Sequence, residues 1–258
     1  MYAPRRFFER HPENRVKLPL VPEDDLADLP SAGLQITRYM HNTPLNHKSV
    51  LVSGNWRDAV AAYLACTEFV DHCVGVILEA LEASAHAKDT VVVLWSDHGW
   101  HLGEKQHWAK RSLWEESTRV PLIFAGPSLG NGNCSRPVGL IDLYPTLNEL
   151  CDLTSPPQTL EGHSLVPLLQ KPDAAWPYPA ITTFHQNDHT IRTEQWRYIR
   201  YANGDEELYD RAADPHEWHN LAAKPEHKGT IAELREHLPK VNAADSPCLL
   251  YTSDAADE

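Results

Sequence analysis

A long amphipathic helix that leads directly into a strand is the feature that most constrains the fold. Between residues 56 and 85, the apolar side chains recur at helical spacing: Val60, Tyr63, Leu64, Val70, Val74, Ile77, Leu78 and Leu81. A short polar turn then leads into an apolar strand at residues 90–95. A second apolar run at 120–125 and helical spacing at 140–150 follow. This alternation predicts an α/β layer architecture with a mainly parallel sheet flanked by helices.

The remainder of the chain divides into three further parts. Residues 1–54 are rich in proline, asparagine and charge, which predicts an irregular surface segment with short helical turns. A proline-rich segment at 167–179 marks a boundary. Beyond it, short strand patterns at 180–184, 189–192, 196–201 and 207–209, and a helix near 226–238, predict a small antiparallel sheet with one covering helix. We therefore expect an α/β domain at 1–172, a small subdomain at 173–240 and a non-native tail at 241–258.

Charge and composition argue against several classes of partner. The formal net charge is -13, and no block of lysine and arginine resembles a nucleic-acid-binding stripe. No run approaches the ~18 apolar residues of a membrane span, and the first twenty residues lack the apolar centre of a signal peptide. The five cysteines are odd in number and without C-x-x-C spacing, so they determine neither the disulfide status nor the redox compartment of the protein. We expect no nucleic-acid partner and no membrane span.

The predicted strand at 90–95 ends in the sequence SDHG, where a cation site is one interpretation. In an open α/β sheet, ligands collect beyond the carboxyl ends of the strands, where Asp97 and His98 stand. A carboxylate beside an imidazole suits a divalent cation, with the histidine as second ligand or as donor to a substrate oxygen. Gly99 then lets the chain turn sharply. In the alternative interpretation, Asp97 caps the next turn and His98 makes an ordinary hydrogen bond.

Lys110 follows His98 by twelve residues and suggests an anionic substrate. A lysine near a bound cation makes electrostatic sense only if an anion lies between them, so a phosphate or sulfate ester is the natural inference. The alternative is a solvated lysine in a polar loop. We interpret Lys105 and His107 in that plainer way.

Several ordered segments resemble the sulfatases, within the alkaline-phosphatase-like superfamily, and most closely the iduronate-2-sulfatase branch. They are SDHGWHLGEKQHWAK followed by TRVPLIFAGP, then VGLIDLYPTLNELCDL, EGHSLVPLL and ELYDRAADPHEWHNLA. The resemblance covers residues 3–240. It implies that Asp97 and His98 bind Ca²⁺, with Zn²⁺ or Mn²⁺ as the runners-up. It also implies that Lys110 contacts the substrate sulfate and that His98 takes part in catalysis.

The resemblance also bears on other residues and on a motif that the chain lacks. It makes His101 and Trp108 substrate-binding walls of the pocket. We interpret Asp142, Tyr144 and Pro145 as structural. The chain lacks the family's C-x-P-S-R or C-x-A-S-R motif, whose cysteine becomes a formylglycine nucleophile. The sequence from Cys134 to Pro137 has the wrong spacing and order, so we do not expect Cys134 to be a nucleophile.

The same comparison predicts that the chain is the C-terminal portion of a sulfatase. In the family, two further metal-binding aspartates and a K-P-H segment precede the long helix, and the chain has no residues that match them. We therefore expect the N-terminal part of the same domain as a missing partner, and an isolated chain without activity.

The expected function is calcium-dependent hydrolysis of a sulfate ester on a sulfated sugar or small molecule. The resemblance implies a periplasmic, secreted or lysosome-like location. One alternative is a phosphodiesterase or phosphatase of the same superfamily, with zinc or manganese. Another is a non-catalytic interaction module, because two ligands rarely fix a cation that takes ~6 to 8 oxygens. The exact substrate and the oligomeric state stay open.

Overall fold

The structure, a computed structural model, describes residues 1–38, 46–127, 129–154 and 156–243. Apart from its first three residues, the expected tail at 241–258 lies outside them. The N-terminal part forms the short helices α1 (Arg5–Phe8), η1 (Glu13–Arg15), α2 (Ser31–Arg38) and α3 (His47–Ser53). The expectation of short helical turns in this segment is confirmed for the described residues.

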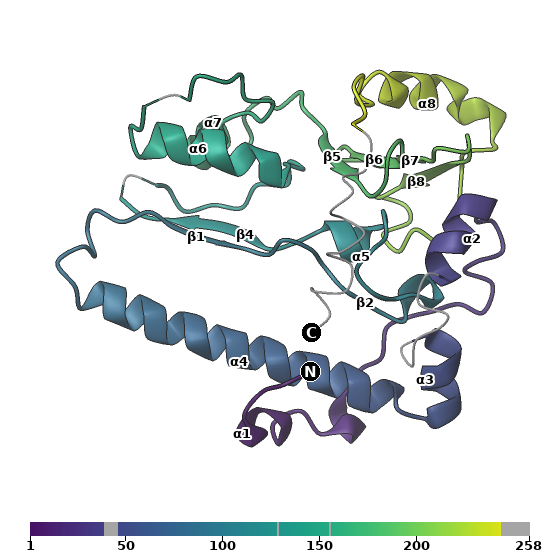
Figure 1. The fold of residues 1–258 in the computed structure, drawn as a ribbon, viewed down its shortest axis with the longest axis horizontal. Helices are drawn as coiled ribbons and strands as arrows, with labels where there is room; N and C mark the ends of the chain where they lie inside the picture. Colours follow the sequence, from purple (N-terminus) through teal and green to yellow (C-terminus); the bar gives the residue numbers. More distant parts are fainter. Residues whose placement is uncertain (39–45, 128, 155, 244–258) are drawn as a thin grey trace.

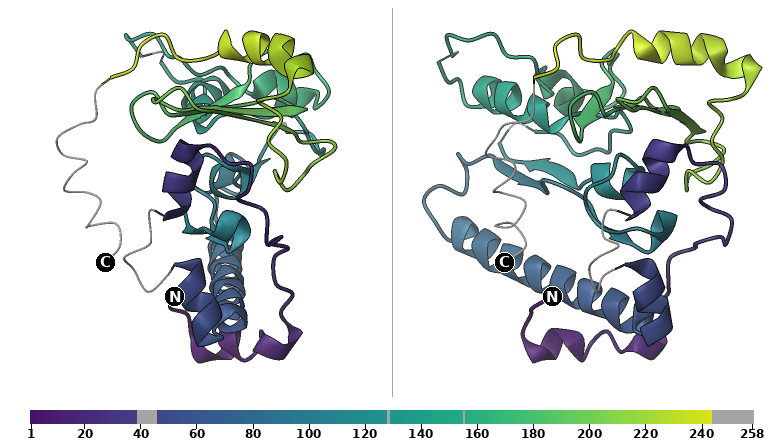
Figure 2. Two further views of the ribbon diagram at one scale, coloured as in Figure 1. Left: turned by 90° about the vertical axis from the view of Figure 1, so that its right-hand side faces the viewer. Right: turned by 45° about the vertical axis from the view of Figure 1, so that its right-hand side comes forward.

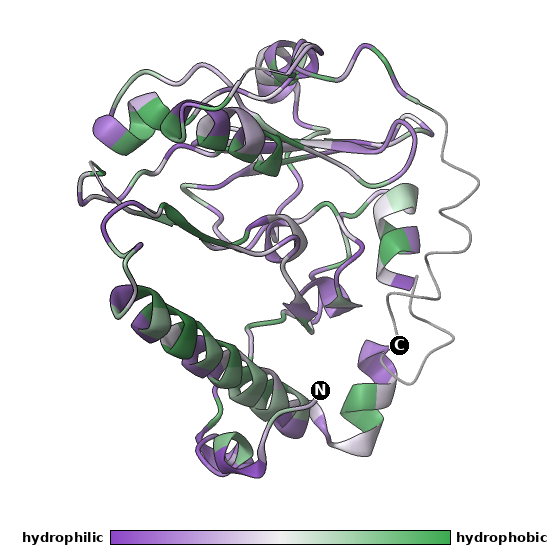
Figure 3. Ribbon diagram, turned by 60° about the vertical axis from the view of Figure 1, so that its left-hand side comes forward, coloured by the Kyte–Doolittle hydropathy of each residue, from purple (hydrophilic) through white to green (hydrophobic). Residues whose placement is uncertain are grey.

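The long helix α4 (Trp56–Glu82) confirms the predicted amphipathic helix. Its first half packs against α1 and η1, and buries Val60, Ala61 and Ala65. Much of the rest of its apolar surface is exposed, as at Val70 and Ile77. Figure 3 shows that apolar residues occur along most of the length of α4. By length and composition alone, α4 could cross a membrane, and only 17% of its most apolar window is buried. Because a soluble helix can pass the same test, the expectation of no membrane span stays a prediction.

The two strands predicted after α4 form a single antiparallel pair. β1 (Val92–Trp95) pairs with β4 (Leu122–Ala125), and Trp95 lies opposite Leu122. The expected mainly parallel sheet is therefore wrong for the described strands, all of which pair antiparallel. The connection at 96–121 leaves and re-enters at the same end of the pair. Its one α-helix among the described residues is the four-residue α5 (Glu115–Thr118), which is too short for the crossover that a parallel pair needs.

The β1–β4 pair lies between α4 on one side and two helices on the other (Figures 1 and 2). These helices are α6 (Leu143–Leu150), which follows the turn η3 (Leu140–Asp142), and α7 (Val166–Gln170). The buried carboxylate of Asp142 accepts the backbone N–H groups of Gly139 and His163, both at 2.8 Å. It thereby ties the start of α6 to the segment before α7, which agrees with a structural role for Asp142.

The C-terminal part forms the predicted four-stranded antiparallel sheet. Its strands pair in chain order: β5 (Ala180–Thr183), β6 (His189–Arg192), β7 (Trp196–Arg200) and β8 (Glu206–Asp210). A turn, η4 (Pro225–His227), leads into α8 (Lys228–Arg235). Ile231 and Leu234 of α8 pack on Ile191, Tyr198 and Leu208 of the sheet. The predicted sheet and covering helix are confirmed.

The other face of this sheet shares a core with distant parts of the chain. Ile199 and Tyr209 of the sheet pack with Leu29 and Ile36 near α2, and with the fully buried Trp114. In this core Glu207 accepts hydrogen bonds from Trp114 Nε1, Tyr201 Oη and Tyr209 Oη at 2.8, 2.7 and 2.6 Å. Because this core crosses the expected boundary at residue 172, the division into two domains stays a prediction.

Candidate functional site

The loop after β1 holds Asp97 and His98 at the end of the strand, as predicted. Gly99 fixes this loop against the end of α5, since its N–H donates to the carbonyl of Ser117 at 2.8 Å. A Cβ on Gly99 would lie only 1.9 Å from the carbonyl oxygen of Glu116. The glycine is therefore required for close backbone packing, and not only for the turn that the sequence suggested.

The surroundings of His98 determine which ring nitrogen is free. Nδ1 lies 2.8 Å from the carbonyl oxygen of Gly99, which can only accept, so Nδ1 carries the proton. In the neutral imidazole, Nε2 then presents a lone pair. This atom lies 3.7 Å from Oδ1 of Asp97, a side chain that is 75% exposed. The pair can therefore direct one nitrogen and one carboxylate toward the same ligand.

Lys110 lies in a loop whose backbone is held in an unusual conformation. The loop contains β2 (His101–Leu102), η2 (Glu104–Gln106) and β3 (Trp108–Ala109). Positive φ angles occur at Lys105 (54°), Gln106 (49°), Ala109 (67°) and Arg111 (52°), so two of these residues flank Lys110. Such conformations cost free energy and concentrate at functional sites. The carbonyl of Lys110 accepts from Nε2 of the buried His107 at 2.7 Å, which holds the turn.

A cavity of about 1220 Å³ brings the three predicted residues Asp97, His98 and Lys110 together. Residues 129–130 and 132–140, Arg136 among them, and strand β5 also line it. The side chain of Lys110 makes no hydrogen bond or ion pair with the described residues. Its ammonium can therefore meet an anion in the cavity.

Two other predicted residues do not reach the cavity. His101 is fully buried, with Nε2 2.8 Å from Oγ of Ser112, and burial lowers its pKa well below the usual range. Trp108 is also buried and donates from Nε1 to His47 at 3.2 Å. Neither side chain lines this cavity, because both pack into the core beneath the loop, and their role as substrate-binding walls stays a prediction.

The two residues interpreted as plain loop residues are also buried. Lys105 pairs with Asp25 at 2.7 Å and donates to the carbonyl of Glu217, so it ties the loop to the N-terminal segment. Burial lowers the pKa of His107, which keeps the imidazole neutral. The interpretation of both as solvated loop residues is therefore wrong.

The described residues supply only part of a metal site. Among residues 1–38, 46–127, 129–154 and 156–243, no three His, Cys, Asp or Glu side chains come together as metal ligands. Asp97 and His98 give one oxygen donor and one nitrogen donor, whereas calcium takes ~6 to 8 oxygens. The pair fits the edge of a divalent-cation site, and a complete site would need ligands from elsewhere.

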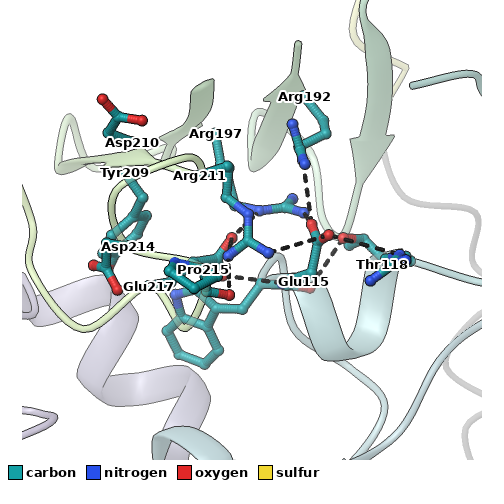
Figure 4. Close-up of polar contacts among 12 residues, drawn as sticks. Glu115, Thr118, Arg192, Arg197, Tyr209, Asp210, Arg211, Asp214, Pro215 and Glu217 are labelled. Carbon is teal, nitrogen blue, oxygen red and sulfur yellow. Dashed lines mark hydrogen bonds and ion pairs between the residues drawn. The ribbon is translucent and has the colours of Figure 1, made fainter. Parts of the chain in front are cut away.

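A cluster of buried charges forms another wall of the cavity, and the sequence patterns did not reveal it. Glu115 of α5 pairs with Arg192, Arg197 and Arg211, and Glu217 pairs with Arg197 and Arg211 (Figure 4). Burial alone would raise the pKa of Glu115, but the three guanidinium groups lower it to about 2. The one sequence signal was the pair of arginines, Arg192 and Arg197, that flank a predicted turn between strands.

Comparison with known proteins identifies the family. The family model described as "Sulfatase" matches residues 5–153. The chain belongs to the sulfatase family. A second model, described as "N-sulphoglucosamine sulphohydrolase, C-terminal", matches residues 103–244.

Three curated relatives show how much of a sulfatase the chain covers. It is 42% identical to "Sulfatase" of Formosa agariphila over 94% of the chain and 48% of the relative. It is 33% identical to "Arylsulfatase K" of Xenopus laevis, over 73% of the chain and 39% of the relative. It is 35% identical to "Choline-sulfatase" of Rhizobium meliloti, over 66% of the chain and 34% of the relative. The chain thus spans about half or less of these relatives. They do not support the expected closeness to the iduronate-2-sulfatase branch.

Solved structures place the fold among the sulfatases. A 2-O GAG sulfatase superposes with a TM-score of 0.69 and 25% identity, and covers 95% of this chain and 61% of its own. A protein solved in complex with its substrate D-glucosamine-2-N,6-O-disulfate superposes with a TM-score of 0.64 and 25% identity, and the match covers 93% of this chain and 54% of that one. A phosphonate monoester hydrolase from Silicibacter pomeroyi superposes with a TM-score of 0.71 at 21% identity, and the match covers 87% of this chain and 49% of that one. This likeness shows a shared fold alone. The expected alkaline-phosphatase-like α/β class is confirmed.

Proposed function

We propose that the full-length protein hydrolyses a sulfate ester and that this chain supplies the Asp97, His98 and Lys110 side of its active site. The single observation that carries the proposal is the convergence of these three residues on one cavity in a chain of the sulfatase family. The nucleophile, a formylglycine by the family resemblance, would come from residues that this chain does not contain.

The roles of the residues follow from their charges and positions. The ammonium of Lys110 binds a sulfate oxygen and stabilises the negative charge that develops as the S–O bond breaks. Asp97 and His98 would hold one edge of a Ca²⁺ site, and the bound cation would supply further positive charge to the sulfate. Zn²⁺ or Mn²⁺ is the runner-up, since the imidazole Nε2 of His98 is a donor that both accept.

A sulfated saccharide is the substrate class that the relatives favour. Two structural neighbours are named for GAG and for disulfated glucosamine, whereas choline-sulfatase is named for a smaller molecule. We therefore propose a sulfated sugar, with a small sulfate ester as the second candidate. A periplasmic, secreted or lysosome-like location stays a prediction from the resemblance.

Substitution of Lys110 in a protein of the relatives' full length tests the proposal. Lys110→Ala is expected to lower kcat/KM for a sulfate ester by about 100-fold or more. Lys110→Arg, which keeps the charge, should retain more activity. Lys88→Ala, which removes an exposed lysine outside the cavity, is the matched control. Near-normal turnover by a folded Lys110→Ala protein would reject the assigned role.

Two measurements separate this proposal from the alternatives. Phosphate and phosphonate esters assayed beside sulfate esters would reveal a phosphodiesterase or phosphatase, which the fold alone leaves open. Calcium titration of the 258-residue chain by calorimetry examines the partial metal site. Binding weaker than millimolar is expected if Asp97 and His98 are only its edge, and micromolar binding would contradict an incomplete site.

A further inference from the structure

The cavity wall has the opposite charge to the rest of the protein. The chain carries a formal net charge of -13, yet the described residues that line the cavity include seven lysines and arginines against Asp97 and Glu115 alone. Glu194 and Glu217 pair with some of these arginines. With these two carboxylates counted, the wall still has an excess of positive charge. A concave cationic surface on an acidic protein concentrates anions at that surface.

The excess is concentrated where the C-terminal sheet meets the cavity. Arg192 of β6 and Arg197 of β7 lie directly opposite each other in the strand register. Like charges in this position repel, so the pair depends on nearby carboxylates. Together with Arg211, the two arginines share just Glu115 and Glu217 as carboxylate partners among the described residues. Burial, reinforced by the charge of Glu217, raises the pKa of neighbouring Glu116 to about 8 and leaves that carboxyl mostly neutral at pH 7. Three positive charges thus face two negative charges.

Arg192 is the member of this cluster that can meet a ligand. Its side chain is 20% exposed, compared with 1% for Arg197 and 8% for Arg211. Nε donates to Glu115 at 3.2 Å, and Nη1 donates to the carbonyls of Thr193 and Glu194. Nη2 makes no hydrogen bond with the described residues, and Arg192 lines the cavity. Two N–H donors of an incompletely neutralised cluster are therefore left without an acceptor among the described residues, on a side chain that lines a cavity able to hold an anion.

We infer that Arg192 binds a second anionic group of the substrate, a carboxylate or a second sulfate on the same saccharide. This inference rests on the proposed function, since it places the sulfate to be cleaved at Lys110. Arg192 lies on the C-terminal sheet and Lys110 on the loop after β1, so the two parts of the chain would select together for a dianionic sugar. Arg192 would then determine specificity without taking part in the chemistry.

The inference predicts a loss that depends on the number of anionic groups in the substrate. In the full-length protein, Arg192→Gln should lower kcat/KM by about 10- to 100-fold for a disulfated monosaccharide, mainly through KM. It should change kcat/KM less than about 2-fold for 4-nitrophenyl sulfate, which has one anionic group. A sulfated uronate used as a third substrate distinguishes a carboxylate from a second sulfate as the preferred group.

Two further variants keep the result interpretable. Arg192→Lys keeps the charge but removes the planar fork, so it should give a smaller loss confined to the dianionic substrates. Arg235→Gln removes an arginine from the same C-terminal part, where it pairs with Glu206 outside the cavity, and should leave both activities unchanged. Circular dichroism establishes that each variant is folded.

Calorimetric binding of the disulfated monosaccharide separates this inference from the proposed function. If Lys110→Ala keeps full turnover, the proposed role of Lys110 fails, whereas Arg192→Gln still reports on the second anion through binding. Weaker binding and a loss confined to dianionic substrates support the subsite. An equal loss with both classes of substrate, or no loss with either, overturns it.

Discussion

Replacement of Gly99 by alanine is the sharpest test of how the loop after β1 is held. The added Cβ would lie 1.9 Å from the carbonyl oxygen of Glu116 and 3.0 Å from that of Arg119. Both neighbours are backbone atoms, so no side chain can rotate away. The loop must move from α5 by more than about 1 Å, which disrupts the hydrogen bond from Gly99 to Ser117. Overpacking costs about 1–3 kcal/mol and a lost hydrogen bond about 1 kcal/mol, so we expect a destabilisation of about 2–4 kcal/mol.

Urea denaturation followed by tryptophan fluorescence and circular dichroism measures this change. The matched control is Gly75→Ala, because a Cβ on Gly75 in the exposed part of α4 meets nothing within 4 Å. Alanine is favoured over glycine within a helix by about 1 kcal/mol, so the control should be neutral or slightly more stable. If Gly99→Ala matched wild type to within about 0.5 kcal/mol, the close backbone packing would be refuted.

Two further predictions concern pH and the exposed helix. Because the pKa of Glu116 is raised to about 8 from an ordinary 4.5, its contribution to stability is complete below about pH 4.5 and is lost as the pH rises toward 8. Urea midpoints should fall over this range and Glu116→Gln should reduce their slope with pH, whereas equal slopes would contradict the raised pKa of this half-buried carboxyl. Replacing the exposed Val70 and Ile77 with glutamine should lower the binding of a hydrophobic dye with little loss of stability. The control Val60→Gln, at a buried position on the same helix, should destabilise the protein. Undiminished dye fluorescence in the Val70 and Ile77 variant would argue against an exposed apolar face on α4.

The sequence predicted local elements well because their apolar periodicity is a local property. The repeat that begins at Trp56 predicted α4, and the short alternating runs predicted β5 to β8. Strand direction was wrong for the pair of β1 and β4, since periodicity identifies a strand but not its partner. The absence of a long helical pattern from the 26-residue connection was the one signal against a parallel crossover.

The candidate site was predictable only where a motif marked it. Asp97 and His98 lie at the cavity, as their position after a strand suggested, and so does Lys110, which the family resemblance marked. His101 and Lys105 belong to the same polar run, but whether a polar side chain faces a cavity or the core depends on distant partners such as Asp25. Arg192 and Glu115 were missed for the same reason, since 77 residues separate them in the chain.

The core that joins Leu29 and Ile36 to the C-terminal sheet has a consequence for biosynthesis. Tyr209, which belongs to the same core, follows Leu29 by about 180 residues. At ~5 to 20 residues per second, the ribosome needs roughly 10 to 35 s to make that interval. Until Tyr209 has been synthesised, Leu29 and Ile36 lack part of their native core. Molecular chaperones that bind nascent chains would therefore be expected to raise the yield of folded protein. The core could be completed only after β8, the last strand, has been synthesised.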